Sequence, residues 1–224
     1  MANRAYVSLW SKNFSEATML EQFERLLETV PFSATRPGFT ELVIRAVDPA
    51  ETSLVERDLR HQPLDAAAVV EMAREYLHAD SAYEVQTHWD LCVYNTGLAR
   101  WQPQPQRLGI ICHGEEYDSG AYAEDGHFQA DIGFEHLFTG HARLLGPATG
   151  SAAPPQHPAE AEFLAVMAQP ENLREYHQKT RENIQKLMDW MRAVEQAVPV
   201  ERYRLWSEGE ENFEARLDEI LAVR

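Results

Sequence analysis

The chain has 224 residues, is 44% hydrophobic and carries 36 acidic residues against 20 lysines and arginines, a formal net charge of −16. This size suffices for one large domain or a domain with an appendage, and a charged fraction of 25% is ordinary for a globular protein and argues against disorder. The negative charge repels phosphate backbones, so we expect no nucleic-acid binding, whereas a basic protein or a cation would be attracted.

The first 94 residues alternate between strand-like and helix-like patterns. We expect strands at 5–10, 40–47, 53–59 and 83–94, and helices at 16–29 and 66–78 that begin after Ser15 and Asp65. This β-α-β-β-α-β order is that of the ferredoxin-like arrangement, an antiparallel sheet with two helices on one face. The predicted fold class is therefore α+β.

Two further strands, at 107–113 and 127–134, would extend this sheet. The segment 95–106 contains Pro103 and Pro105, so we expect a long loop there. A hairpin with such a loop would place Cys92 approximately opposite Cys112.

The pattern changes after residue 145. Residues 146–158 are rich in Gly, Ala and Pro and read as a linker between a sheet domain, 1–145, and a helical segment, 159–224. That segment would contain helices at 159–168 and 170–198 and a final helix capped by Ser207 and Glu210. The inward residues of the final helix would be Phe213, Leu217, Ile220 and Leu221.

The long helix carries a heptad seam, in which the spacing alternates between three and four residues. The seam consists of Leu173, His177, Thr180, Ile184, Leu187, Met191, Val194 and Val198. It would serve either as a brace that packs on the sheet domain or as the contact of a homodimer through 170–198, and the sequence favours neither.

Strand 83–94 has two different faces, because successive side chains of a strand point to opposite sides. The odd positions are mostly apolar, and the even positions include His88, Asp90 and Cys92. This polar row is either a site or the solvated side of a sheet.

The sequence lacks complete catalytic motifs such as G-x-S-x-G, a phosphate-binding G-x-x-x-x-G-K, H-E-x-x-H and C-x-x-C. We therefore predict no catalytic residue and no cofactor. The alternative is a metal-dependent hydrolase that holds a divalent ion such as zinc, because His, Cys and carboxylate ligands suit that metal. Its ligands would be His88, Asp90, Cys92, His113, His127 and Asp131.

Residues 115–125 form an acidic segment, with five carboxylates and two tyrosines. The acids lack the alternating spacing of a calcium loop, so a solvated tip that contacts a protein is the better interpretation. The predicted binding residues are Glu115, Glu116, Tyr117, Asp118, Tyr122, Glu124 and Asp125.

The two cysteines are too few for a disulfide framework, and no run approaches the roughly 20 apolar residues of a membrane span. Residues 1–14 also lack the apolar stretch of a signal peptide. The sequence thus predicts a cytoplasmic, non-enzymatic interaction protein with no membrane contact. An immunity protein or inhibitor that binds a basic toxin is one concrete form. A sensor with a small-ligand pocket between sheet and helices is a third interpretation.

Overall fold

The computed structural model describes residues 3–141, 144 and 158–222, and its centre is one seven-stranded antiparallel sheet. The strand order is β3-β2-β4-β5-β6-β1-β7. The strands are β1 (Arg4–Ser11), β2 (Phe39–Ala46), β3 (Val55–Asp58), β4 (Ser81–Asn95), β5 (Arg100–His113), β6 (Phe128–Phe134) and β7 (Val200–Ser207). The predicted α+β class is confirmed.

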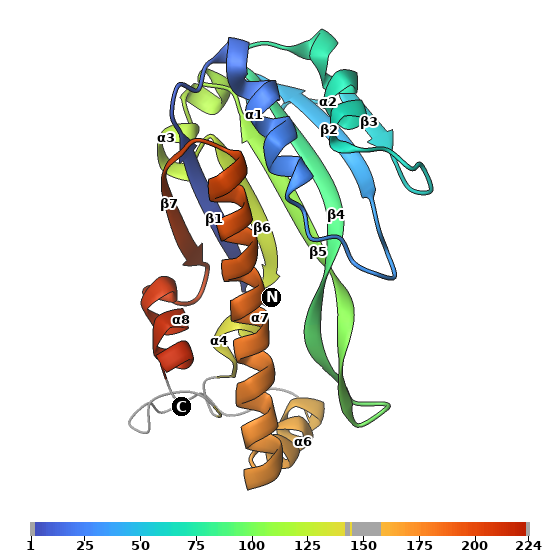
Figure 1. Cartoon of the computed structure of the whole chain (residues 1–224), viewed down its shortest axis with the longest axis vertical. Coiled ribbons are helices and arrows are strands. Elements are labelled where there is room, and N and C mark those ends of the chain that lie inside the picture. The colour runs from blue at the N-terminus through green and yellow to red at the C-terminus, as the bar shows by residue number, and fades with distance from the viewer. Residues whose placement is uncertain (1–2, 142–143, 145–157, 223–224) are drawn as a thin grey trace.

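The helices of the described residues lie mainly on one face, where α1, α2 and α7 cross in front of the sheet in Figure 1. The α-helices are α1 (Glu16–Glu28), α2 (Ala66–Ala73), α3 (Tyr122–Asp125), α4 (His136–Thr139), α6 (Pro158–Met167), α7 (Pro170–Ala197) and α8 (Phe213–Ala222). Two short 3-10 helices are η1 (Arg74–Tyr76) and η2 (Tyr117–Ser119). None of the helices described is long and apolar enough to cross a membrane.

The first six elements follow the predicted β-α-β-β-α-β order along the chain. In space, β4, β5 and β6 lie between β2 and β1, because these strands form a meander that fills the sheet beneath the α1 crossover. The two predicted helix starts are also confirmed. Ser15 and Thr18 form a capping box at α1, and the Asp65 carboxylate accepts the Ala68 amide proton at 2.9 Å.

The expected long loop at 95–106 is wrong, because β5 already begins at Arg100 and pairs with β4 along its full length. Pro103 and Pro105 lie on the part of β5 that extends past β6, which pairs only with residues 109–112. A proline is tolerated there because its missing N–H would point to a free edge. Cys92 therefore pairs with Pro103, and Cys112 pairs with Tyr83, so the expected cysteine pairing is also wrong.

The matching edge of β4 is closed by α7 and by the loop after α1, because β2 pairs with β4 only up to Thr87. The Asn183 side chain accepts the Cys92 N–H at 2.7 Å and donates to the Cys92 carbonyl at 3.1 Å. Lys186 Nζ donates to the Asp90 carbonyl at 2.7 Å. Residues 88–92, which we call the arm of β4, thus have partners for their backbone groups on the side away from β5, where β2 no longer pairs.

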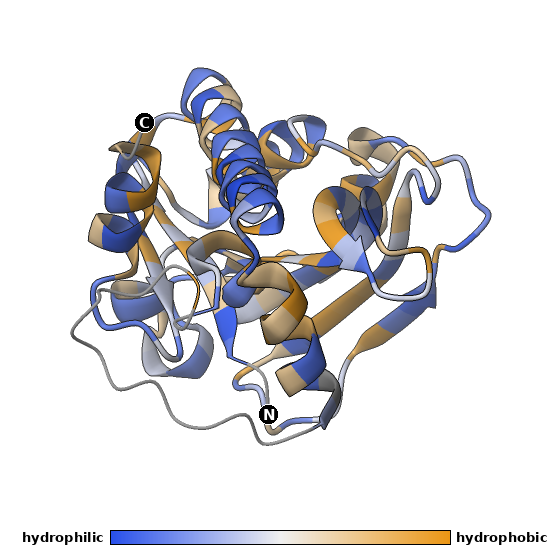
Figure 2. Ribbon diagram, turned by 90° about the horizontal axis from the view of Figure 1, so that it is seen from below, coloured by the Kyte–Doolittle hydropathy of each residue, from blue (hydrophilic) through white to orange (hydrophobic). Residues whose placement is uncertain are grey.

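The heptad seam packs inside the chain. Ile184, Leu187, Met191 and Val194 are buried in the core. Trp190 lies beside them, with its ring centroid 5.9 Å from that of Trp89 and its indole N–H donating to Thr29 Oγ1 at 3.0 Å. Figure 2 shows mainly hydrophilic residues on the outer side of α7. The seam therefore serves as a brace, and a homodimer through 170–198 stays a prediction that would use this polar side.

The C-terminal segment contributes β7, which sequence analysis missed, to the same sheet through pairing with β1. Ser207 is the end of this strand, and its hydroxyl accepts the Glu210 N–H in a turn before α8 begins at Phe213. The expected helix cap is therefore wrong. Phe213, Leu217 and Ile220 are buried as predicted, whereas Leu221 is exposed. The predicted linker, apart from Pro158, lies outside the described residues.

Candidate functional site

The polar row of β4 lies on the side of the sheet opposite the core, as the alternation predicts. Trp89 and Leu91 are buried, whereas His88, Asp90 and Cys92 are half-buried. The Asp90 carboxylate accepts the Ala34 N–H at 2.9 Å, and the Cys92 thiol lies 3.4 Å from the Glu182 carboxylate. Burial and this carboxylate raise the pKa of Cys92, which favours the protonated thiol.

The other predicted metal ligands lie in separate surroundings. The Asp131 carboxylate forms an ion pair with Arg4 at 2.6 Å. Among the candidates, the structure brings His113 and His127 together. The backbone N–H of His113 donates to the backbone carbonyl of His127 at 2.8 Å. Within the described part of the chain, no three His, Cys, Asp or Glu side chains gather in a way that could hold a metal. A metal-dependent hydrolase stays a prediction without structural support of its own.

His127 is held in its neutral form. Its Nδ1 accepts a hydrogen bond from the Ser11 N–H at 3.0 Å. A proton on Nδ1 would face this N–H donor, and the hydrogen bond would be lost. The ring lies between Phe14 and Tyr122, with centroid distances of 4.1 and 4.9 Å. Burial, with smaller contributions from the neighbouring His113 and Arg202, lowers the pKa of His127 to about 4.

This arrangement predicts that acid destabilises the fold. In the unfolded chain His127 binds a proton below its ordinary pKa of about 6.5, whereas in the folded chain it does so only near pH 4. The contribution of His127 to the free energy of unfolding is therefore complete above pH 6.5 and is lost as the pH falls from 6.5 to 4. The loss from His127 amounts to at most roughly 3 kcal/mol. The free energy of unfolding from urea titrations at several pH values checks this. His127→Asn keeps an acceptor without the titration and should flatten the slope; an unchanged slope would contradict the assignment.

The acidic segment 115–125 lies at the upper end of the sheet in Figure 1, where it forms η2 and α3. Glu115, Glu116, Asp118 and Glu124 are exposed and Asp125 is half-buried. Its backbone is fixed by hydrogen bonds from Asp118 N to the Val47 carbonyl at 2.7 Å and from Glu116 N to the Ala79 carbonyl at 2.8 Å. The carboxylates therefore stand on a defined framework.

The two tyrosines of this segment differ in what they offer to a partner. Tyr117 is 5% exposed and its ring stacks on His113, so it belongs to the interior. Tyr122 is half-buried, and its carbonyl accepts the Trp10 indole N–H at 2.9 Å. The carboxylates and the edge of Tyr122 are thus the groups that a partner would meet.

Val47, which sequence analysis missed, lies directly beside the acidic segment. It is 56% exposed and has a φ of 72°, which is a strained conformation for a β-branched residue. Its backbone is held on both sides, because its N–H donates to the Asp80 carbonyl while its own carbonyl accepts from Asp118. Strained backbone that the surrounding structure maintains is concentrated at functional sites. We call residues 47–51 and 115–125 the acidic end surface.

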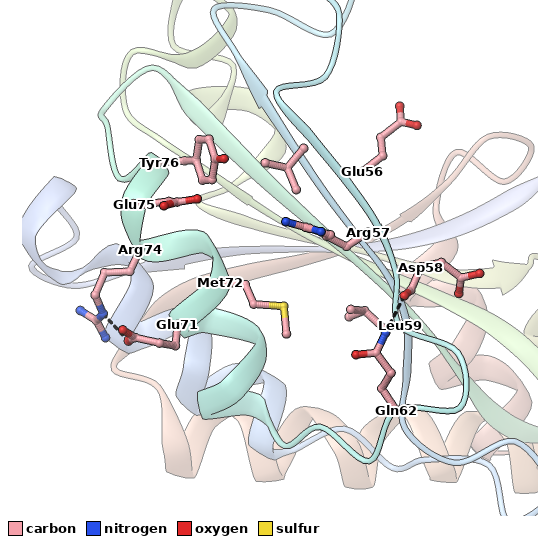
Figure 3. A pocket seen from close by; sticks show the side chains of 11 residues that line it. Glu56, Arg57, Asp58, Leu59, Gln62, Glu71, Met72, Arg74, Glu75 and Tyr76 are labelled. Carbon is pink, nitrogen blue, oxygen red and sulfur yellow. Dashed lines mark hydrogen bonds and ion pairs between the residues drawn. The ribbon is translucent and has the colours of Figure 1, made fainter.

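A groove of about 850 Å³ lies elsewhere, between β3 and α2 (Figure 3). Arg57 and Met72 point into the groove from its two sides, whereas Glu56 and Asp58 point away from α2. Several of its charges are paired internally, including Arg74 with Glu71 at 2.7 Å. This groove matches the predicted position of a ligand pocket between sheet and helix, but its paired charges identify no ligand.

Comparisons with protein-family models, with curated proteins and with solved structures find no match to this chain. The function therefore has to be argued from the residues of the chain itself.

Proposed function

We propose that this protein is a protein-interaction module that docks a basic partner on the acidic end surface. An immunity protein or inhibitor that neutralises a basic toxin is the concrete form we favour. One observation carries the proposal: among the described residues, Glu115, Glu116, Asp118, Glu124 and Asp125 form no ion pair, although the chain has ion pairs elsewhere. Five carboxylates without an ion pair create a local negative potential, which the Arg204 guanidinium offsets only in part by donating to the Glu124 carbonyl at 2.9 Å. This potential accelerates the approach of a cationic protein.

The surface also has the composition of a protein interface. Protein interfaces combine an apolar centre with a polar rim. Val47 supplies exposed apolar area, and the turn that follows it adds Pro49 and Ala50, which are exposed as well. Asp48 and Glu51 continue the negative charge around them. The carboxylates would then guide the encounter, and burial of the valine would contribute to the lifetime of the complex.

A short oligolysine peptide is the first probe, followed by the isolated partner. Amide chemical shifts of the labelled chain should respond to oligolysine at the acidic end surface and saturate. The test variant replaces four carboxylates: Glu115→Gln, Glu116→Gln, Asp118→Asn and Glu124→Gln. It should lose this response and should associate with the partner about tenfold more slowly at low salt.

The matched control removes four exposed carboxylates from α7, α8 and the turn before α8, and so carries the same net charge. Its substitutions are Glu175→Gln, Glu195→Gln, Glu211→Gln and Asp218→Asn. This variant should behave as the unchanged protein does. If both variants lose binding equally, or if the shifts spread evenly over the chain, net charge alone is responsible and the proposed surface is wrong.

A further inference from the structure

A second cavity has a basic lining, although the chain as a whole is acidic. It has a volume of about 730 Å³ and lies between the loop after α1, the loop after β3 and His88 of β4. This volume lies within the range of roughly 300–1,000 Å³ typical of small-molecule sites. None of its lining residues is acidic, whereas Arg36, Arg60, His61 and His88 all contribute to its wall. In a chain with 36 acids and 20 lysines and arginines, such a lining is unusual.

The charges around the cavity are not all compensated. Arg60 forms an ion pair with Asp58 at 2.6 Å, so its charge is balanced. Arg36 is exposed and its guanidinium has no ion pair or hydrogen bond among the described residues. Arg107 lies on the far side of His88, with its Nε donating to Gln86 and its guanidinium 3.7 Å from Glu84. Arg36 is therefore the arginine of this group whose charge and N–H donors a ligand could bind.

The loop that carries Arg36 is held in place on β4. Ser33 N donates to the His88 carbonyl at 2.8 Å, and Ala34 N donates to the Asp90 carboxylate at 2.9 Å. The Ser33 hydroxyl then accepts the N–H groups of Thr35 and Arg36, both at 3.2 Å. The nearby carboxylate of Asp90 is thus occupied as a clamp for the loop and does not line the cavity. This fixed loop keeps Arg36 at the cavity without requiring a ligand to order it.

His88 fits an anion better than the metal ion that the sequence suggested as an alternative. Its Nδ1 is sealed from solvent and has no hydrogen-bond partner. Burial, and then Arg36 and Arg107, lower the pKa of His88, so the ring is neutral in the empty cavity and its surroundings repel a cation. An anion beside the ring would accept a hydrogen bond from it, and its negative charge would oppose the effect of the two arginines and favour the charged imidazolium.

We propose that this cavity binds a small organic anion through a phosphate or carboxylate group. Arg36 provides the charge, His61 and His88 donate further hydrogen bonds, and Pro37 and Pro63 form apolar walls against the body of the ligand. Guanidinium groups bind either oxyanion well because their donors match its geometry. The site is separate from the acidic end surface, so the two proposals stand or fall independently.

Titrations of the labelled full chain at constant ionic strength test this proposal. Phenyl phosphate and benzoate represent the two kinds of oxyanion, and phenol and benzyl alcohol are neutral controls of similar shape. We expect saturable amide shifts at the loops after α1 and β3 with at least one anion and none with the neutral compounds. The tighter of the two anions identifies the preferred group, and the His88 ring pKa should rise when it binds.

Two variants make the result specific. Arg36→Gln should weaken binding about 10- to 100-fold, the effect of removing a charged hydrogen-bond partner. Arg25→Gln, at an exposed α1 arginine paired with Glu21, removes the same charge elsewhere and should leave the affinity unchanged. Equal affinity in Arg36→Gln, no saturation with either anion, or stoichiometric Zn²⁺ binding at His88 would each overturn the proposal.

Discussion

Asn183→Leu should destabilise the fold by about 3–6 kcal/mol, because it leaves three backbone groups without a partner. The buried Leu137 carbonyl should cost roughly 1–3 kcal/mol, and the part-buried Cys92 N–H and carbonyl about 1–1.5 kcal/mol each. Asn183 accepts the Cys92 N–H and donates to the carbonyls of Cys92 and Leu137, at 2.7, 3.1 and 3.0 Å. It is 3% exposed, so water cannot replace it. Leucine matches asparagine in size but offers neither donor nor acceptor. The free energy of unfolding in urea measures the loss.

Gln185→Leu is the matched control, because Gln185 is an exposed neighbour on α7 and bonds only to Asp189 among the described residues. We expect a change of less than about 0.5 kcal/mol. A similarly small effect of Asn183→Leu would show that the arm of β4 does not depend on α7 for its backbone partners. Hydrogen exchange at Cys92 gives a second measure, since its amide should lose protection in the Asn183 variant and keep it in the control.

Gly126→Ala should cost about 4 kcal/mol, because the added methyl group meets backbone that cannot yield and the conformation itself is unfavourable. Gly126 has φ 93° and ψ 157°, a combination that is nearly exclusive to glycine. An added Cβ would lie 2.7 Å from Leu9 N and 2.9 Å from the Phe128 carbonyl oxygen, in the backbones of β1 and β6. The melting temperature and the free energy of unfolding both measure the effect.

Gly120→Ala is a control at a left-handed glycine (φ 88°, ψ 36°) that lacks the close contact. The nearest atom to an added Cβ is 3.8 Å away. The conformational cost alone should therefore amount to about 1–2 kcal/mol. Equal effects of the two substitutions would show that the close approach of β1 and β6 to Gly126 is relieved by small movements of the strands.

Most elements of this fold could be predicted from local patterns. The alternation of Tyr83 to Leu91 predicts β4 and its buried face, and the caps at Ser15 and Asp65 predict the starts of α1 and α2. The errors arise where tertiary structure decides. Pro103 and Pro105 read as a loop, yet an edge without a neighbouring strand accepts them in β5. Val200–Ser207 does not alternate regularly between apolar and polar residues, so β7 depends on its pairing with β1, and the long helix before it suggested a helical segment throughout.

The candidate sites were predictable only in part. The acidic segment is visible in the sequence because five carboxylates lie within residues 115–125, with no lysine or arginine among them. The cavity around His88 was not, since Arg36 and His61 reach it from two loops whose sequences mark them only as breaks between elements. The alternation of side chains along β4 predicts that His88 points away from the buried row of Trp89 and Leu91. The charge of its neighbours, however, depends on how those two loops fold back. That charge is what separates a metal ligand from an anion ligand.

The pairing of β1 with β7 has a consequence for how the protein is made. Leu9 pairs with Tyr203, so one side of an early strand stays open on the ribosome until residues 200–207 have emerged. The backbone groups of Asp90 and Cys92 in β4 likewise lack their partners until α7 has emerged. Contacts between such distant residues close slowly. The nascent chain should therefore depend on chaperones that shield exposed strand edges during synthesis, and the sheet should form as a whole only late in translation.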